Sequence, residues 1–313
     1  MQTIRQYEIV AALATHRHFG RAATALGISQ PSLTRSVNRI EALLGGPLFD
    51  RAGCTPTIFG EIVLRHGGAV LASSAEMSRE ISLTKGLDVG HLSVAVAFYP
   101  ADISGYDAAA LLARRYPALT VDLRIMDWAR AKDGVLAGAV DLAFADIRSA
   151  KGSPDFEVYP VRAGPLSFFC AARHPLARRK DIGFGDLTQY PWVGPSLPPQ
   201  MTAAMPKGDL PCCVFDAAGG WLRPRILVET FAAAKRVVRA SEALSACLPF
   251  QIRDDLAAGE LVLPPVPTPQ IDLDYGFILK RGRLASPAAK AFMQKARRVE
   301  KAISASNAER KSA

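Results

Sequence analysis

Apolar residues recur at the three- and four-residue spacing of α-helices through the first 44 positions. The first segment predicts a helix ending near His16, whose apolar face is made of Ile4, Tyr7, Val10, Ala11 and Ala14. A second helix follows, with Phe19, Ala22, Ala23 and Leu26 facing inward. The paired alanines let a third helix cross closely, and Gly27 supplies the turn because glycine tolerates a positive φ.

A third helix is predicted to begin after Ser29, a favourable N-cap residue. Its apolar positions, which dock on the first two helices, are Leu33, Val37, Ile40 and Leu44. The opposite side carries short polar groups and guanidinium groups, with Gln30 and Thr34 at its flanks: Pro31, Ser32, Arg35, Asn38 and Arg39. Such a surface at a helix N-terminus can enter the major groove of DNA and contact base edges and phosphate. The alternative is that this face is an ordinary solvated helix surface. The preceding helix, with its paired alanines Ala22 and Ala23, favours the DNA-binding interpretation.

A long helix is predicted next. Residues 47–56 form a short apolar return and a wing, and Thr57 then caps a helix from Ile58 to Lys85. Apolar residues repeat every seven positions at Val63, Val70 and Met77, beside Ile62 and Ala69. This spacing predicts a helix that pairs with a second copy. Packing on its own domain is the structural alternative.

Residues 86–90 are predicted to be a linker, beyond which short apolar strands alternate with amphipathic helices. The strand candidates are Leu92–Ala97, Thr120–Ile125, Asp141–Ala145, Phe156–Val161, Leu166–Ala172, Ile226–Val228, Leu244–Leu248 and Tyr275–Leu279. The helix candidates are Tyr106–Tyr116, Ala129–Ala137, Thr230–Ala240, Gln251–Ala258 and Pro287–Ile303. The alternation favours parallel-sheet α/β units, arranged as two small lobes with a ligand cleft at the C-terminal strand ends.

Charge and cysteine usage narrow the function classes. The net charge of +9 is uneven: residues 1–88 hold nine Lys/Arg and seven Asp/Glu, whereas residues 280–313 hold ten against two. Total charge is therefore weak support for DNA binding. The five cysteines include no CxxC pair, so reduced thiols are expected and a zinc site is not, although Cys212-Cys213 leaves a redox-sensor role open. The sequence shows no signal peptide and no apolar run that could span a bilayer.

An enzyme is the main hypothesis from another class. The sequence contains no Gly-x-Ser-x-Gly elbow, no glycine-rich phosphate loop and no metal-spaced histidine cluster. We therefore assign no catalytic residue, no metal ligand and no cofactor.

The chain resembles the LysR-type transcriptional regulators over nearly its whole length. The resemblance rests first on Phe19-x-x-Ala22-Ala23-x-x-Leu26, Ser29-Gln30-Pro31-Ser32-Leu33-Thr34, Ile40-Glu41-x-Leu43-Leu44-Gly45, Leu48-Phe49-x-Arg51 and Thr57-x-x-Gly60. Looser matches follow at Gly90-His91-Leu92-Ser93-Val94, Leu136-x-Gly138-x-Val140-Asp141-Leu142-Ala143, His174-Pro175-Leu176-Ala177, Gly259-Glu260-Leu261-Val262 and Ser286-Pro287-Ala288. The first set in this order is highly specific.

The resemblance implies an α/β protein with an N-terminal all-α winged helix-turn-helix. The implied domains are a DNA-binding domain at residues 1–58, a linker and dimerisation helix with hinge at 59–88, an effector-binding domain at 89–304, and a flexible basic tail at 305–313. The effector domain would resemble periplasmic binding proteins. Its first lobe would comprise residues 89–162 and 267–304, and its second lobe residues 163–266.

Site residues are carried over from the same resemblance. The implied DNA readers are Gln30, Pro31, Ser32, Thr34 and Arg35, with Asn38 on the same face and Arg51 at the wing. Glutamine suits bidentate contact with adenine, and arginine suits guanine or phosphate. The wing departs from the family pattern because it is shorter and has no basic residue at its tip.

The implied effector site is formed by Tyr99, Pro100, Ala101, Ser196, Leu197, Thr230 and Phe231. Many relatives place Ser or Thr after the first strand to hold a carboxylate, but this chain has Phe98-Tyr99-Pro100-Ala101-Asp102 there. Core packing is the alternative for Tyr99 and Phe231. Turn chemistry and helix capping are the alternatives for Ser196 and Thr230.

The leading functional hypothesis is a sequence-specific, cytoplasmic, bacterial regulator that responds to an unidentified small-molecule effector bound between two lobes. The resemblance implies a dimer through the linker helix, assembly to a homotetramer, an interrupted palindromic operator in double-stranded DNA, nucleoid association and contact with RNA polymerase, without a membrane partner. The alternative is a ligand-independent DNA-binding regulator whose lobes serve only oligomerisation.

Overall fold

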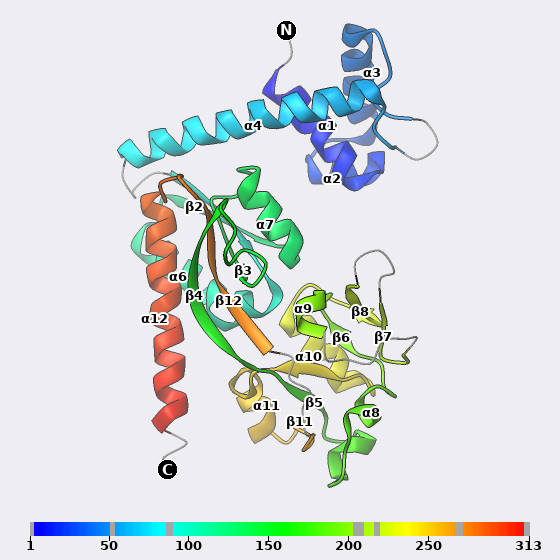
Figure 1. Cartoon of the computed structure of the whole chain (residues 1–313), viewed down its shortest axis with the longest axis vertical. Coiled ribbons are helices and arrows are strands. Elements are labelled where there is room, and N and C mark those ends of the chain that lie inside the picture. Colours follow the sequence, from blue (N-terminus) through cyan, green and yellow to red (C-terminus); the bar gives the residue numbers. More distant parts are fainter. Residues whose placement is uncertain are drawn as a thin grey trace. The chain divides into compact units, whose positions relative to one another are not determined.

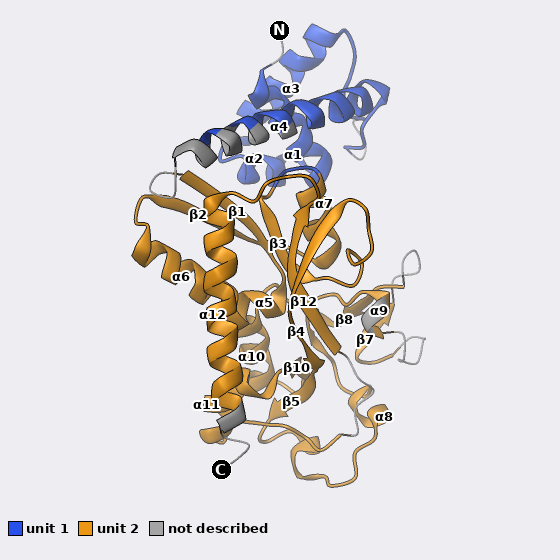
Figure 2. Cartoon of the chain, turned by 60° about the vertical axis from the view of Figure 1, so that its left-hand side comes forward, with its two compact units in different colours: residues 1–81, 137–139 blue, residues 82–136, 140–313 orange. Residues whose placement is uncertain are grey.

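The computed structural model describes residues 3–50, 54–85, 90–202, 210–215, 220–266 and 272–309. The chain divides into two compact units (Figure 2). Unit 1 comprises residues 1–81 with 137–139, and unit 2 comprises residues 82–136 with 140–313. No helix in the described ranges is long and apolar enough to cross a membrane.

Unit 1 is built on three short helices, α1 (Ile4–His16), α2 (Phe19–Ala25) and α3 (Gln30–Leu44). Their shared core contains Ala22, Ala23, Leu33, Val37 and Ile40, as the apolar spacing predicts. The prediction for α1 was wrong in part. Ile4 is 45% exposed, whereas Ile9 and Leu13 are buried. Apolar residues on two neighbouring faces of α1 show the same helical spacing, so the spacing does not tell which face is buried. Contact with α2 and α3 decides that.

A short return follows α3 and leads to α4 (Ile58–Lys85), whose bounds agree with the prediction. Phe49 pairs antiparallel with Pro56, and the Thr57 hydroxyl accepts a hydrogen bond from the Gly60 N–H at 3.3 Å. Thr57 therefore caps α4 as expected. A Cβ on Gly60 would lie 2.1 Å from the Leu48 carbonyl oxygen, so this position accepts no side chain.

The seven-residue repeat of α4 serves two purposes. Val63 is buried in the core of unit 1, which corrects its assignment to a pairing seam and agrees with the structural alternative there. Val70 and Met77 are 40% and 57% exposed, and Ile62 and Ile81 are also exposed. The helix thus packs on its own domain near its start and presents apolar side chains further on.

Unit 2 contains a five-stranded sheet in the order β2-β1-β3-β12-β4. The strands are β1 (Gly90–Val96), β2 (Leu119–Ile125), β3 (Leu142–Asp146), β4 (Phe156–Pro165) and β12 (Asp272–Lys280). Strands β1, β2 and β3 are parallel, as predicted, but β12 runs antiparallel to both β3 and β4. The chain leaves this sheet along β4 and returns along β12, so the returning strand must point the other way.

Three helices cover the sheet of this first lobe. They are α6 (Tyr106–Arg115), α7 (Trp128–Leu136) and α12 (Pro287–Glu309). Side chains of α6 and α12 share one core cluster with Val94 and Phe144, while α7 shares another with Ala95 and Ala143. Successive strand residues therefore face opposite layers. Helix α12 continues past residue 304, where a flexible tail was expected to begin.

The second lobe contains shorter strands. Strand β5 (Ser167–Ala171) pairs with β10 (Ser245–Cys247) and β11 (Leu261–Val262), β6 (Val193–Gly194) with β9 (Ile226–Leu227), and β7 (Cys213–Phe215) with β8 (Leu222–Pro224). Its helices are α8 (Phe184–Leu187), α9 (Pro199–Thr202), α10 (Phe231–Ala240) and α11 (Arg253–Ala257). The predictions missed β6, β7, β8 and β11, which are too short for a periodic signal. Strands β4 and β12 link this lobe to the first (Figure 1).

Short helical turns complete the fold. Helix α5 (Phe98–Pro100) and a π-helical turn (Ala101–Gly105) lead directly from β1 into α6. Two 3₁₀ turns lie in the second lobe, η2 (Pro175–Arg178) and η3 (Pro249–Ile252). The loop after β1 is therefore helical, although the sequence predicted a loop there.

We predict that Gly60→Ala destabilises unit 1, because the added methyl group would collide with the Leu48 carbonyl oxygen. The free energy of unfolding should fall by about 1–3 kcal/mol, which is the usual cost of adding a methyl group to a well-packed core. Gly68→Ala is the matched control on the same helix, since nothing lies within 4 Å of its added Cβ. That variant should gain about 0.5–1 kcal/mol from helix propensity. Equal unfolding midpoints in urea for both variants would contradict the prediction.

Candidate functional site

The N-terminal turn of α3 presents the predicted DNA-reading surface. The Ser29 hydroxyl caps the helix by accepting from the Ser32 N–H at 3.4 Å, and it donates to the Ser32 hydroxyl oxygen at 2.9 Å. Gly27 has a φ of +66°, so the turn before the helix uses the left-handed backbone expected of it. The cap therefore fixes where α3 starts and which residues form its first turn.

The side chains predicted to read DNA come together on this turn. Gln30, Pro31, Arg35 and Asn38 are exposed, and Ser32 and Thr34 are half-buried. The Arg35 guanidinium donates to the Ser32 hydroxyl at 3.3 Å. The Thr34 hydroxyl donates back to the Gln30 carbonyl at 3.1 Å, which leaves its methyl group as the outward contact. The surface offers the Gln30 amide and the Arg35 guanidinium at a helix N-terminus, a combination that suits base edges and phosphate.

The wing is described only at its base. The Asp50 N–H donates to the Thr55 carbonyl at 2.9 Å, and Cys54 has a positive φ of 49°. Arg51, predicted to contact phosphate, lies outside the described residues. The role of Arg51 therefore stays a prediction.

The predicted effector residues after β1 lie at the junction of the two lobes and are deeply buried. Tyr99, Pro100 and Ala101 belong to α5 and the turn after it. The Tyr99 hydroxyl donates to the Ala246 carbonyl of β10 at 3.2 Å, so the side chain crosses from the first lobe to the second. Burial raises the pKa of Tyr99 and keeps the phenol protonated. These contacts agree with the core-packing alternative and leave an effector role of Tyr99 as a proposal.

The predicted residues of α10 also pack at this junction. The Thr230 hydroxyl accepts from the Ala233 N–H at 3.3 Å and is the N-cap of α10. Phe231 is 1% exposed, with its ring centroid 6.1 Å from that of Phe98 and 5.9 Å from that of Phe169. Phe98 belongs to the first lobe and Phe231 to the second, so the aromatic contact also joins the lobes.

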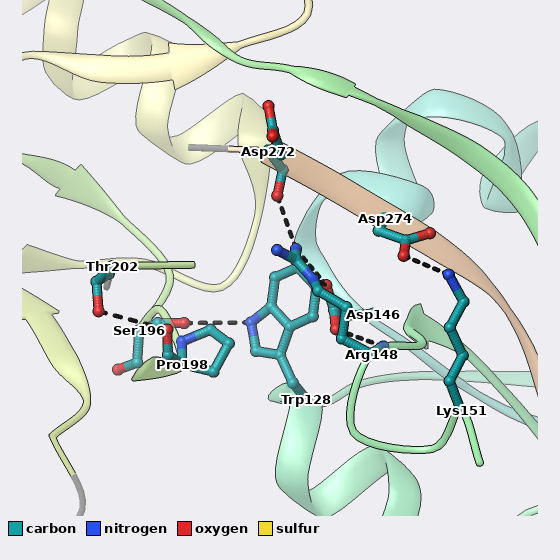
Figure 3. A network of polar contacts seen from close by, with 9 residues as sticks. All are labelled: Trp128, Asp146, Arg148, Lys151, Ser196, Pro198, Thr202, Asp272 and Asp274. Atoms are coloured by element: carbon teal, nitrogen blue, oxygen red, sulfur yellow. Dashed lines mark hydrogen bonds and ion pairs between the residues drawn. The ribbon is translucent and has the colours of Figure 1, made fainter. Parts of the chain in front are cut away.

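A second cross-lobe hydrogen bond at the junction involves Ser196. The Trp128 indole N–H, at the start of α7, donates to the Ser196 carbonyl at 3.2 Å (Figure 3). Leu197 exchanges two backbone hydrogen bonds with Leu222, of 2.9 and 3.0 Å, so the segment is held by the second lobe. The Ser196 backbone thus lies at the junction, while the Leu197 side chain is nearly fully buried, and an effector role of both residues stays a prediction.

An arginine lies at the same edge of the first lobe. The Arg148 Nε donates to Asp146 Oδ2 at 2.8 Å, and its Nη2 donates to the Asp272 carbonyl at 2.7 Å, just where β12 begins (Figure 3). Burial raises the pKa of Asp146, and the hydrogen bonds and charge of Arg148 oppose that rise. The Arg148 side chain is 23% exposed, so it is only partly shielded from solvent.

Trp128, Asp146 and Arg148 were not predicted from the sequence. Asp146 and Arg148 follow the predicted strand 141–145 directly, and ligands bind at the C-terminal ends of parallel strands. Applying that rule to the third strand as well as to the first would have found them. Trp128 carried no such signal, since an aromatic residue at a helix start is usually part of the core.

Potential metal ligands are dispersed over the described residues, and four of the five cysteines are buried. No group of three or more His, Cys, Asp and Glu side chains within them could hold a metal ion. All five cysteines are free thiols, and the Sγ atoms of Cys212 and Cys213 lie 3.3 Å apart in the buried interior. Burial raises the pKa of the Cys170 thiol to about 12, so this thiol stays protonated at neutral pH.

Comparisons with known proteins identify the family of both parts of the chain. Residues 4–61 match the bacterial regulatory helix-turn-helix family named lysR, and residues 85–301 match the LysR substrate binding domain. The SDS degradation transcriptional activation protein of a Pseudomonas species is 32% identical over 298 residues, which cover 93% of this chain and 94% of that protein. A probable RuBisCO transcriptional regulator of a Synechocystis species is 26% identical over 301 residues, which cover 93% of this chain and 85% of that protein.

Solved structures share the fold. Full-length CbnR in complex with its target DNA has a TM-score of 0.53 and 22% identity, covering 95% of this chain and all of that chain. A full-length AphB variant has a TM-score of 0.62 and 12% identity, covering 94% of this chain and 98% of that chain. At these identities the likeness extends to the fold alone.

We predict that Trp128→Phe weakens the junction, because it leaves the Ser196 carbonyl without its indole donor. The free energy of unfolding should fall by about 1 kcal/mol relative to a matched control. Trp221→Phe is that control, since the Trp221 indole makes no hydrogen bond to any part of the chain that the structure describes. The measurement is urea denaturation of both variants. A loss no larger than that of the control would show that the cross-lobe bond adds no stability.

Proposed function

The chain belongs to the LysR family of bacterial transcriptional regulators, and on that premise we propose how its own residues read an operator and sense an effector. The protein is a transcriptional regulator with a DNA-binding helix-turn-helix domain and an effector-binding domain. The α3 turn that begins at Gln30 is the base-reading element. The observation that carries this proposal is the capped, exposed first turn, in which Ser32 orients the Arg35 guanidinium.

The proposed DNA-contacting residues fall into two groups, those that contact base edges and those that contact phosphate. Gln30 and Arg35 supply bidentate donors and acceptors for base edges, and Asn38 lies two turns into the helix on the same face. The Ser32 hydroxyl and the Gln30 N–H face phosphate. Arg51 contributes a wing contact to the backbone. Because unit 1 carries little net charge, one copy supplies few phosphate contacts, and two copies are needed for a tight complex.

Pairing is proposed to occur through α4. The exposed apolar residues Ile62, Val70, Met77 and Ile81 lie on a helix that otherwise packs with Val63 on its own domain. Burying such residues against a second copy would remove apolar surface from water. A two-fold pair of α3 helices would read an interrupted palindrome. We also propose that two such dimers assemble to a tetramer, and that the DNA-bound protein contacts RNA polymerase.

The effector is proposed to bind at the junction of the lobes. In this proposal its walls are formed by Tyr99, Pro100 and Ala101 after β1, by Thr230 and Phe231 at the start of α10, and by Ser196 with Leu197 of the second lobe. Arg148 adds a half-buried guanidinium at the edge, whose Nε and Nη2 are bonded to Asp146 and Asp272, and an anionic group on the ligand would pair with the remaining Nη1. A ligand at this place would change the cross-lobe contacts of Tyr99 and Trp128. It would thereby favour one lobe arrangement over another.

The DNA-reading proposal is tested with Arg35→Ala. An operator is first selected from a random DNA pool, and affinities are then measured at one stated salt concentration. Loss of a base contact should cost about 1–3 kcal/mol, or about 5- to 150-fold, for the selected operator. Arg114→Ala is the charge-matched control, because it removes an exposed arginine of α6 in the other unit. Its operator affinity should be unchanged.

Two outcomes would count against a base contact by Arg35. Unchanged operator affinity would remove the residue from the interface. An equal loss on operator and unrelated DNA would make it a phosphate contact instead.

The pairing proposal is tested with Val70→Glu. A buried carboxylate in an apolar seam should dissociate the dimer at micromolar concentration, as measured by sedimentation velocity. Arg65→Glu is the control, because residue 65 is exposed and lies about 140° around the helix from Val70 at about 100° per residue. A Val70→Glu protein that sediments like the control would place the dimer contact elsewhere.

A further inference from the structure

A pocket of about 510 Å³ lies in the groove between α6 and α12 of unit 2. Its apolar walls come from Leu111 of α6, Val299 and Ile303 of α12, and Phe250 of η3. The volume is that of a typical small-molecule site. None of the residues at the Tyr99 and Trp128 junction lines it, so it is separate from the effector site proposed above.

Both lobes contribute to this pocket. The walls from α6 and α12 belong to the first lobe, whereas Phe250 and Arg253 belong to the second. The Arg253 guanidinium donates to Asn307 Oδ1 of α12 at 2.6 Å, which ties the two lobes beside the pocket. Figures 1 and 2 draw helix α11 at the level of the C-terminal end of α12.

The pocket is also next to the strand that crosses between the lobes. The Arg162 guanidinium of β4 lies 5.3 Å from the ring centroid of Phe250, and its Nε donates to Glu300 at 2.7 Å. Phe250 is therefore held on one side by a fixed cation of β4 and presents its remaining surface to the pocket. A ligand in the pocket would therefore contact Phe250, which itself contacts strand β4.

The charges at the pocket favour an anion. Arg253 and Arg298 line it, against the single carboxylate of Asp107. Arg298 is exposed and makes no hydrogen bond or ion pair with any residue whose position the structure describes. An unpaired guanidinium at the edge of an apolar pocket matches a ligand that has an apolar body and an anionic head.

We propose that this pocket is a second ligand site, and that it binds a small amphipathic organic anion. The apolar body packs between Leu111, Val299 and Ile303, and the anionic head pairs with Arg298. Because the pocket is lined from both lobes, its occupation favours the lobe arrangement that keeps both walls in place. That regulatory consequence rests on the proposed function, whereas the binding itself does not.

The test is a fluorescence titration of the full-length protein with 8-anilinonaphthalene-1-sulfonate, followed by displacement with decanoate. Saturable binding at one site is expected. Ala302→Trp fills the pocket and should weaken binding at least about tenfold. Arg298→Gln should weaken it about fivefold, the size of a partly exposed ion pair, and Asp107→Asn should strengthen it about twofold.

Matched controls lie on the exposed face of α6 outside the pocket. Ala113→Trp adds the same side chain there and Arg114→Gln removes the same charge, and both should bind the probe like the unsubstituted protein. Circular dichroism of Ala302→Trp checks its folding, and Arg298→Gln tests the proposal through an exposed residue if the tryptophan variant does not fold.

Three results would overturn the proposal. The first is equal probe affinity in Arg298→Gln and Arg114→Gln. The second is displacement by decylammonium as effective as by decanoate, which would exclude an anion site. The third is an Ala302→Trp protein whose oligomeric state changes while its probe affinity does not, which would make the groove an interface between copies. The titrations contain no DNA, so their failure would leave operator reading by α3 untouched.

Discussion

The pairing of β4 with β12 is the contact on which unit 2 depends. These two strands carry the chain out of the first lobe and back, and they remain paired from Phe156–Lys280 to Pro165–Asp272. The register shifts at Tyr275 and Gly276, and a Cβ on Gly276 would lie 2.2 Å from the Tyr159 carbonyl oxygen. This ribbon makes the antiparallel half of the sheet and fixes where the second lobe begins.

A buried carboxylate holds the ribbon to the helix layer. Glu300 of α12 accepts hydrogen bonds of 2.7 Å from Ser104, Tyr275 and Arg162, and it is 5% exposed. Burial and the neighbouring Glu300 raise the pKa of Tyr275, so that its hydroxyl stays a donor. Removing one partner from such a cluster is costly because it leaves a buried charge uncompensated. The network joins β4, β12, α12 and the turn before α6, and it stands beside the pocket between α6 and α12.

The two units differ in how far their function could be predicted. In unit 1, the DNA-reading turn depends on contacts between residues three apart, the Ser29 cap and the Arg35–Ser32 bond, and Leu33 and Val37, which dock α3 on α1 and α2, recur at helical spacing. Local spacing therefore carries most of the information. In unit 2, the junction joins residues more than 60 positions apart, such as Trp128 with Ser196 and Tyr99 with Ala246. No local pattern specifies which of these side chains meet, so the predicted effector residues remain proposals.

The sequence by itself determined the helix-turn-helix, the bounds of α4, the α/β alternation and the principal strands, because each follows from periodicity and capping within one segment. The tertiary structure decided the rest. It selected Ile9 and Leu13 over Ile4 in α1, assigned Val63 to the core of its own domain, turned β12 antiparallel and extended α12 past residue 304. It also placed Arg148 and Trp128 at the junction of the lobes and formed the pocket between α6 and α12. The physical reason is that burial and pairing between distant segments are set by how the elements pack, which spacing along the chain does not encode.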